Sequence, residues 1–305
     1  MRWENEREST NIEDRRGNGG GLGGGSGLPF LGGGRLGLGT IAVILVGGWL
    51  LGINPLTLLG LLSGTDMGTS TRQQSYAPQQ QSRQQGQTQG SNDPAKRFVS
   101  VVLGSTEDVW SRIFQASGAR YTPPGLVLFT GRTATACGTG VTGAGPFYCP
   151  GDRKIYIDLA FNSILKNQLG ADGDTAQAYV IAHEVGHHIQ NLTGTLQKME
   201  EARRRLDARR YNALSVRLEL QADCYAGIWA NHSQKALNWF DANDIAEAMN
   251  AASAVGDDAI QRKAGGSVNQ ESFTHGSSQQ RLAWFRIGYE SGSVQKCDTF
   301  ANQRP

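Results

Sequence analysis

The chain has 305 residues, a formal net charge of +2 from 29 basic and 27 acidic residues, and 41 glycines. This balanced charge creates no field that would gather nucleic acid, so we exclude binding to DNA or RNA. The length allows one large or two small domains, and the glycine content with a mean hydropathy of −0.39 indicates that part of the chain builds no core.

Three segments precede the predicted folded domain. Residues 1–35 join a mixed-charge start to a glycine run, and glycine at this density loses too much backbone entropy on folding, so we expect a disordered N-terminal tail. Residues 36–62 are apolar and uncharged, which is long enough for a transmembrane anchor. Residues 63–94 are rich in Gln and Ser and are predicted to form a flexible linker.

The predicted anchor can be oriented by its flanking charges. Basic residues before residue 36 outnumber those shortly after residue 62, which favours an N-terminus inside and a catalytic domain outside the cytoplasm. A cleaved signal peptide is the alternative, although the long leader and the lack of an A-x-A site after the span disfavour it.

The predicted topology also bears on the oxidation state of the four cysteines. A compartment outside the cytosol permits disulfides, and four cysteines allow three pairings. We favour Cys137 with Cys149 and Cys224 with Cys297, and four free thiols are the alternative.

The folded domain, residues 95–305, is predicted to be α+β, mostly helical with a small sheet. A helical pattern begins after Asp93-Pro94, is interrupted at residues 104–106, and resumes as a second amphipathic helix around Trp110. Residues 126–130 and 154–159 have the apolar, β-branched character of strands.

Residues 178–190 contain the motif H-E-x-x-H as His183, Glu184 and His187. On an α-helix two residues four apart share a face, so both imidazoles can reach one metal ion. Glu184 between them can take a proton from a bound water, which is the layout of a zinc metalloprotease. Because the motif specifies only three residues, an accidental match is the alternative.

A second predicted helix supplies a third donor. Catalytic zinc keeps three protein ligands and an open position, and Glu219 can complete the set. Asp223 lies one turn further along the same face, where it can accept the other ring N–H of a ligating histidine. Two solvated charges on an exposed helix are the alternative, but the surrounding apolar residues favour a buried face: Leu218, Leu220, Ala222, Ala226 and Trp229.

H-E-x-x-H followed by a helix with E-x-x-x-D is similar to the gluzincins, and the chain as a whole resembles the neutral zinc metallopeptidase family of bacterial membrane-anchored proteins. The resemblance implies a zincin-like metallopeptidase domain behind one transmembrane helix in the bacterial inner membrane. It also implies Zn²⁺ as cofactor and a protein or peptide as substrate. In zincins an exposed strand beside the metal pairs with the substrate backbone, and Ile155–Phe161 resembles it. An ordinary sheet strand is the alternative for this stretch.

Peptide hydrolysis places negative charge on a tetrahedral oxyanion, which needs a donor or cation opposite the metal. His275 is the candidate, with Arg281 as a helper; related gluzincins carry a T-H-P…R pattern, in which Gly276 here replaces the proline. A capping or buried hydrogen-bonded histidine is the alternative. His188 and His232 are assigned structural roles, since His188 is rotated by about 100° from His187 on the helix.

The sequence therefore predicts a membrane-anchored zinc-dependent endopeptidase with Glu184 as general base. The alternative is a non-catalytic membrane-tethered scaffold or chaperone with a structural zinc, whose site would be closed by four protein ligands. A cytosol-facing regulator is a third hypothesis, and it requires the opposite topology and reduced cysteines.

Overall fold

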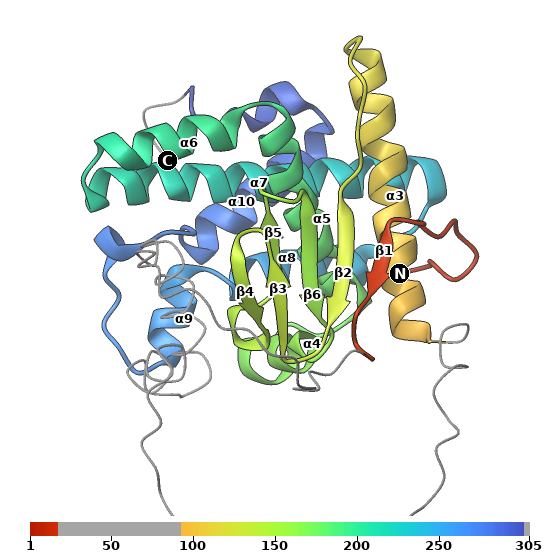
Figure 1. Ribbon diagram of the computed structural model, residues 1–305, viewed down its shortest axis with the longest axis horizontal. Helices are drawn as coiled ribbons and strands as arrows, with labels where there is room; N and C mark the ends of the chain where they lie inside the picture. The colour runs from red at the N-terminus through yellow and green to blue at the C-terminus, as the bar shows by residue number, and fades with distance from the viewer. Residues whose placement is uncertain (18–92, 302–305) are drawn as a thin grey trace, which may run out of the picture.

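The computed structural model describes residues 1–17 and 93–301 (Figure 1). The strands are β1 (Ile12–Asp14), β2 (Gly125–Phe129), β3 (Arg132–Thr135), β4 (Gly138–Val141), β5 (Phe147–Cys149) and β6 (Lys154–Asp158). The helices are α3 (Pro94–Ala116), α4 (Phe161–Ile164), α5 (Asp174–Leu192), α6 (Thr195–Arg205), α7 (Ala208–Leu237), α8 (Ala242–Ala254), α9 (Asp257–Lys263) and α10 (Ser278–Ser291). The predicted combination of many helices with a small sheet is confirmed.

The sheet has the strand order β1-β2-β6-β5, with parallel pairing except between β5 and β6. The two inner strands are buried on both faces, as the continuous apolar runs of β2 and β6 require. Leu126, Leu128, Ile155 and Ile157 face the main helical core. The opposite face carries a smaller apolar cluster, and the β3–β4 hairpin lies over this side of the sheet (Figure 1).

Helix α3 is continuous, so the interruption predicted at residues 104–106 is wrong. Asp93 caps its start by accepting hydrogen bonds from the backbone N–H groups of the first turn, and Pro94 follows at a position where no N–H is needed. Gly104 lies inside the helix because the N-terminal segment crosses there: a Cβ atom would lie 2.7 Å from the carbonyl oxygen of Arg7. The glycine therefore provides a close approach and not a break.

Helix α5 lies at the centre of the fold, in contact with α3, α7, α8 and β5. Gly186 makes its contact with α7 close, because a Cβ atom at this position would lie 3.0 Å from the Cα of Ala222. Helix α7 in turn packs closely against α10 through Gly227 and Gly288, where added Cβ atoms would lie 2.1 and 2.0 Å from backbone oxygens of the facing helix. Small residues at these crossings thus allow three helices to meet with little space between their backbones.

The N-terminal segment differs from the predicted disordered tail over residues 1–17. Strand β1 pairs with β2 in the main sheet, with Ile12 opposite Leu126. Glu107, on α3, accepts hydrogen bonds from the Ser9 hydroxyl at 2.6 Å and the Asn11 amide at 2.7 Å. These residues are therefore part of the folded domain, because paired backbone and buried polar contacts offset the entropy lost on ordering them.

The predicted fold class and localisation included a transmembrane helix, and both need correction. Within residues 1–17 and 93–301, no helix has the length and apolar character needed to cross a bilayer. The predicted anchor at 36–62 lies outside the described residues, and so does the predicted linker at 63–94 except for its last two residues. Strands β1 and β2 belong to one sheet, so the chain before and after the predicted anchor lies on the same side of any membrane. The predicted topology, with the N-terminus inside and the domain outside, is therefore wrong.

Both favoured disulfides are confirmed. Cys137, at the turn of the β3–β4 hairpin, is bonded to Cys149 at the end of β5. Cys224, on α7, is bonded to Cys297 near the end of the described chain, across a sequence separation of 73 residues. The alternative of four free thiols is thereby contradicted.

Candidate metal centre

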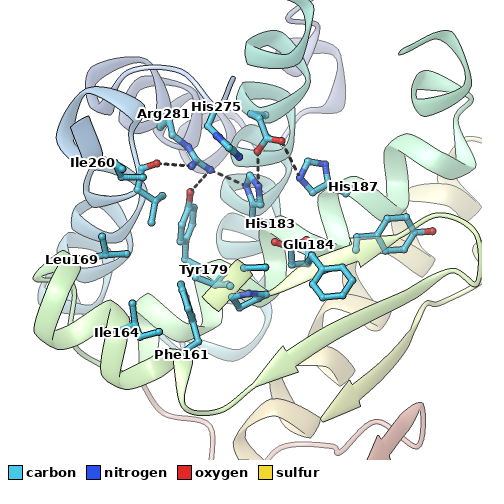
Figure 2. A pocket seen from close by; sticks show the side chains of 18 of the residues that line it. Phe161, Ile164, Leu169, Tyr179, His183, Glu184, His187, Ile260, His275 and Arg281 are labelled. Carbon is cyan, nitrogen blue, oxygen red and sulfur yellow. Dashed lines mark hydrogen bonds and ion pairs between the residues drawn. The ribbon is translucent and has the colours of Figure 1, made fainter. Parts of the chain in front are cut away.

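His183 and His187 lie one turn apart on α5, and their side chains meet a carboxylate from α7. The Nε2 atom of His183 is 3.1 Å from Glu219 Oε2, and the Nε2 atom of His187 is 3.6 Å from Glu219 Oε1. Figure 2 shows both rings turned towards the same side of the cavity, with Glu184 beside them. The close contact at Gly186 is what brings α7 within reach of both imidazoles.

This group of three side chains fits zinc. One ligand atom from each of His183, His187 and Glu219 lies within 4.8 Å of the other two. Zinc binds nitrogen and oxygen ligands at about 2.0–2.2 Å, so two donors at corners of a tetrahedron around it lie about 3.4 Å apart. The observed separations of 3.1 and 3.6 Å fall on either side of that value. The same residues line a cavity of about 290 Å³, which leaves room for water and a substrate group.

The outer ring nitrogens of both histidines are held by hydrogen bonds. Asp223 Oδ1 lies 2.9 Å from His183 Nδ1, and Gln190 Oε1 lies 2.9 Å from His187 Nδ1. Because a carboxylate or an amide oxygen only accepts, each histidine donates from Nδ1, so the Nε2 lone pair is the one that would face a bound metal. Asp223 therefore occupies the position predicted for it, while the contribution of Gln190 was not foreseen.

Asp223 is also the partner of a buried arginine. Arg281 Nε and Nη2 donate to its two carboxylate oxygens at 2.8 and 2.9 Å, and the Tyr179 hydroxyl donates to Oδ1 at 2.5 Å. Burial alone would raise the pKa of Asp223, but the charges of Arg281 and His183 hold it below its ordinary value. The guanidinium predicted to help at the oxyanion is thus fixed on Asp223, which keeps the orienting carboxylate ionised.

Glu184 is placed differently from the other acids. It is buried beside the metal-binding histidines and lines the cavity, yet within the described residues its carboxylate accepts no hydrogen bond. Burial raises its pKa, and the neighbouring imidazoles only partly oppose that effect. A carboxylate with a raised pKa and free oxygen atoms is suited to exchanging protons with a bound molecule.

His275 lies at the same cavity, oriented by a residue that the sequence analysis missed. Asp257 Oδ2 accepts from the backbone N–H groups of Thr274, His275 and Gly276 at 2.7, 2.7 and 3.0 Å, and Oδ1 is 3.2 Å from His275 Nδ1. Burial lowers the pKa of His275, but the hydrogen bond to Asp257 and the charges of Glu219 and Asp257 outweigh this effect and leave the pKa raised. A proline at position 276 would lack the N–H that Asp257 binds, which explains the departure from the T-H-P pattern.

One end of the cavity is apolar. Figure 2 shows Phe161, Ile164, Leu169 and Ile260 gathered at the end away from His187. Arg281 also lines the cavity, and its guanidinium group is bound to Asp223. The apolar side chains that line this end are Phe161, Ile164, Leu169, Val180, Val255 and Ile260.

The strand predicted to bind substrate backbone is an inner strand. Residues Ile155–Asp158 belong to β6, which pairs with β2 on one side and β5 on the other, so its backbone groups are already occupied. The interpretation of Ile155–Phe161 as a substrate strand is therefore wrong, and the alternative of an ordinary sheet strand holds. The strand of the sheet that lines the cavity is β5, through Phe147 and Tyr148.

The remaining histidines have structural partners. His188 is fully buried, with Nε2 2.7 Å from the Thr122 carbonyl oxygen and Nδ1 3.0 Å from the Tyr148 hydroxyl. Burial lowers the pKa of His188 to about 4, so it stays neutral near pH 7. His232 lies 3.0 Å from the Gly292 carbonyl oxygen. Both residues therefore hold neighbouring segments in place.

Comparison with known proteins agrees with this geometry. The chain belongs to the family described as "putative neutral zinc metallopeptidase", whose model matches residues 1–300. It is 45% identical over 303 residues to the uncharacterized protein YpfJ of Escherichia coli (strain K12), which covers 98% of this chain and 99% of the relative. It is 41% identical over 221 residues to the uncharacterized protein Rv2575 of Mycobacterium tuberculosis (strain H37Rv), covering 68% and 72%. The family implies zinc and a protein or peptide substrate.

No solved structure matches the chain. The zincin-like part of the predicted fold class therefore gains no support, and the arrangement to report is the one observed: a mostly helical domain with a four-stranded sheet whose order is β1-β2-β6-β5.

Replacing Glu219 with alanine is expected to lower zinc affinity by at least about a hundredfold, because loss of a ligand should exceed the 10–100-fold effect typical of its outer partners. Elemental analysis and chelator competition on the purified full chain measure the change. Glu201→Ala is the matched control, since Glu201 is exposed on α6 away from the cavity. Equal zinc content in both variants would remove Glu219 from the ligand set.

Proposed function

We propose that this protein is a zinc-dependent endopeptidase that hydrolyses peptide bonds with water. The observation that carries the proposal is that one cavity holds a His-His-Glu donor set and the buried carboxylate of Glu184, which accepts no hydrogen bond from the part of the chain that the structure describes. When bound by His183, His187 and Glu219, zinc lowers the pKa of a water molecule towards neutrality and polarises the substrate carbonyl.

Glu184 acts as the general base and then as the general acid. Its carboxylate, which no described protein group binds, takes a proton from the attacking water. The protonated carboxyl group of Glu184 then gives that proton to the leaving nitrogen. The carboxylate returns to its starting state after each turnover, as hydrolysis requires.

His275 stabilises the oxyanion. Asp257 holds Nδ1 and fixes the loop around His275, so the ring presents its other N–H to the cavity that it lines. A charged donor aimed at developing negative charge in a site of low dielectric contributes more than it would in water. Asp257 acts through His275 and is a positioning residue.

The alternative of a structural zinc requires a fourth protein ligand. Asp223 is the next acidic residue after Glu219 on α7, but its oxygens bind Arg281, the Tyr179 hydroxyl and the outer nitrogen of His183. It therefore lies on the far side of the His183 ring from Nε2. The remaining side of the donor set borders the cavity, which favours an open, catalytic site over a closed one.

Glu184→Gln is expected to retain zinc but to reduce hydrolysis by about 10²- to 10⁴-fold, the usual contribution of general acid–base catalysis. An unstructured protein such as casein serves as substrate, with cleavage followed by gel electrophoresis and bound zinc by elemental analysis. The full chain is used, because a fragment beginning at Pro94 would lack strand β1.

Chelation of wild-type protein should stop cleavage, and added zinc should restore it. A Glu201→Gln variant, altered on the exposed face of α6, should cleave as the wild type does. Undiminished cleavage by Glu184→Gln would refute the assigned base, and cleavage that resists chelation would refute the metallopeptidase proposal itself.

Asp257→Asn is expected to move the alkaline limb of the pH profile of kcat/KM to lower pH. The Asp257 charge raises the pKa of His275, so the imidazolium persists to higher pH in the wild type, and it loses its proton earlier once that charge is removed. Initial rates of cleavage of one peptide, measured from about pH 5 to 10, give the position of this alkaline limb. The neighbouring variant Asp258→Asn, which alters a carboxylate bound to Ser278 and Arg262, should leave it in place. Identical limbs in all three proteins would show that His275 is not the titrating group.

The apolar end of the cavity favours substrates with a large apolar side chain next to the cleaved bond. Ile164→Glu is expected to lower kcat/KM for such peptides by about tenfold or more, because a charge then faces the apolar group. A panel of peptides that differ only at the position beside the cleaved bond measures the preference. Ile287→Glu makes the same substitution at an exposed site on α10, and this variant should keep the wild-type preference for a large apolar side chain. A preference that survives Ile164→Glu would place this subsite elsewhere.

A further inference from the structure

The two histidines of the donor set differ in what holds them. His183 is bound by a carboxylate, whereas His187 is bound by the side-chain amide of Gln190. An amide can present either its oxygen or its NH₂ group to an imidazole. The orientation of the Gln190 amide therefore decides which nitrogen of His187 carries the proton, and hence which one is free for a metal.

The Gln190 amide is held in one orientation by what lies behind it. Its Nε2 donates to the Leu218 carbonyl oxygen at 2.7 Å and to Gln221 Oε1 at 3.2 Å. Gln190 is fully buried, so no water can take over these bonds. If the amide flipped, its oxygen would face the Leu218 carbonyl, which cannot donate. The oxygen of Gln190 thus faces His187, which keeps its proton on Nδ1.

The side-chain amide of Gln221 is oriented in the same way, by a hydrogen bond to a group further from His187. Its Nε2 donates to the carbonyl oxygen of Cys297 at 3.1 Å, which leaves Oε1 to accept from Gln190. Gln221 is buried on α7, two residues after the carboxylate donor Glu219. Three hydrogen bonds of consistent direction therefore connect the Cys297 carbonyl to the ring of His187.

The Cys297 carbonyl is itself fixed by the C-terminal segment, here residues 294–301. Cys297 is fully buried and is bonded to Cys224 on α7. Two residues later the Thr299 hydroxyl donates to the Arg217 carbonyl oxygen at 2.7 Å. The segment is thus attached to the helix that carries Glu219 on both sides of the point where it meets Gln221.

We propose that Gln190 and Gln221 are positioning residues that transmit hydrogen-bond direction from the disulfide-held C-terminal segment to His187, and so set the affinity for zinc. The inference rests on the proposed function only in taking His187 as a metal ligand. It concerns zinc binding and not hydrolysis, so its test is independent of whether any peptide is cut.

The test compares zinc affinities of full-length variants by competition with a chromophoric chelator. Gln221→Leu removes the central amide at similar volume, and Cys224→Ala with Cys297→Ala releases the segment. Each is expected to weaken zinc binding by about tenfold, the lower range for outer partners of metal ligands. The variant that combines all three substitutions should have the same zinc affinity as whichever of the two simpler variants binds zinc more weakly. The losses should not add, because both changes interrupt one chain of hydrogen bonds.

The second disulfide provides the matched control. Cys137→Ala with Cys149→Ala also removes a disulfide, but this one joins the β3–β4 hairpin to β5 and has no link to Gln190. Zinc affinity should stay within about threefold of wild type in this variant, by the same comparison. Thermal unfolding of the zinc-free proteins shows which of them are folded.

A second readout tests the hydrogen bond to His187 directly. In nitrogen–proton correlation spectra of the zinc-loaded wild type, the Nδ1–H signal of His187 should exchange slowly with water, because Gln190 accepts its hydrogen bond. In Gln221→Leu, which keeps both disulfides, Gln190 loses one of the two acceptors of its Nε2 group, so this exchange should become faster. A destabilised but correctly oriented site would not show this change.

An unchanged exchange rate of the His187 Nδ1–H and an unchanged zinc affinity in folded Gln221→Leu would overturn the proposal. So would additive losses in the combined variant, because these would mean that the disulfide acts on zinc by another route.

Discussion

The contact between α5 and α7 is the constraint on which the site depends. The donors come from two helices, and they meet because Gly186 on α5 lets the backbone of Ala222 approach without a side chain between them. The two histidines flank that glycine on one side of the crossing, and Glu219 lies one turn before Ala222 on the other. An added methyl group at Gly186 would force the helices apart at the point where donor separations of 3.1 and 3.6 Å are required.

A second requirement is charge balance in a buried region. Glu219 and Asp223 are both largely shielded from water, and burial alone would favour their neutral forms. The imidazoles hold the pKa of Glu219 well below its ordinary value, and Arg281 keeps the pKa of Asp223 below its ordinary value. Arg281 reaches Asp223 from α10, whose glycine contact with α7 brings the two helices close. The third helix thus keeps the site ionised without contributing a donor to it.

Both ends of the described chain are packed into this core and bonded to it. Strand β1 completes the sheet at the edge away from the cavity, and Glu107 binds the segment just before it. The C-terminal segment is bonded to α7 by a disulfide and reaches the second histidine through two glutamines. The metal-binding helices are therefore supported from segments far away in the sequence.

Local patterns in the sequence were sufficient for the two strands at residues 125–129 and 154–158 and for the two helices that carry the central motif and Glu219. The spacing of His183 and His187 follows from the helical repeat alone, as does the placing of Glu219 and Asp223 on one face of a second helix. The motif pattern also indicated family membership, which the comparisons show. These predictions succeeded because residues three or four apart on a helix are neighbours whatever the rest of the fold does.

Only the tertiary structure decided which distant groups complete the site. Nothing in the sequence connects Asp257 to His275 or Gln190 to Gln221 and Cys297, because these contacts depend on how separate helices pack. The same limit explains the wrong assignments: β6 is an inner strand, and residues 12–14 form a strand despite the glycine run that follows. Composition and periodicity describe a segment by itself, whereas pairing and burial depend on the partner that the fold places beside it.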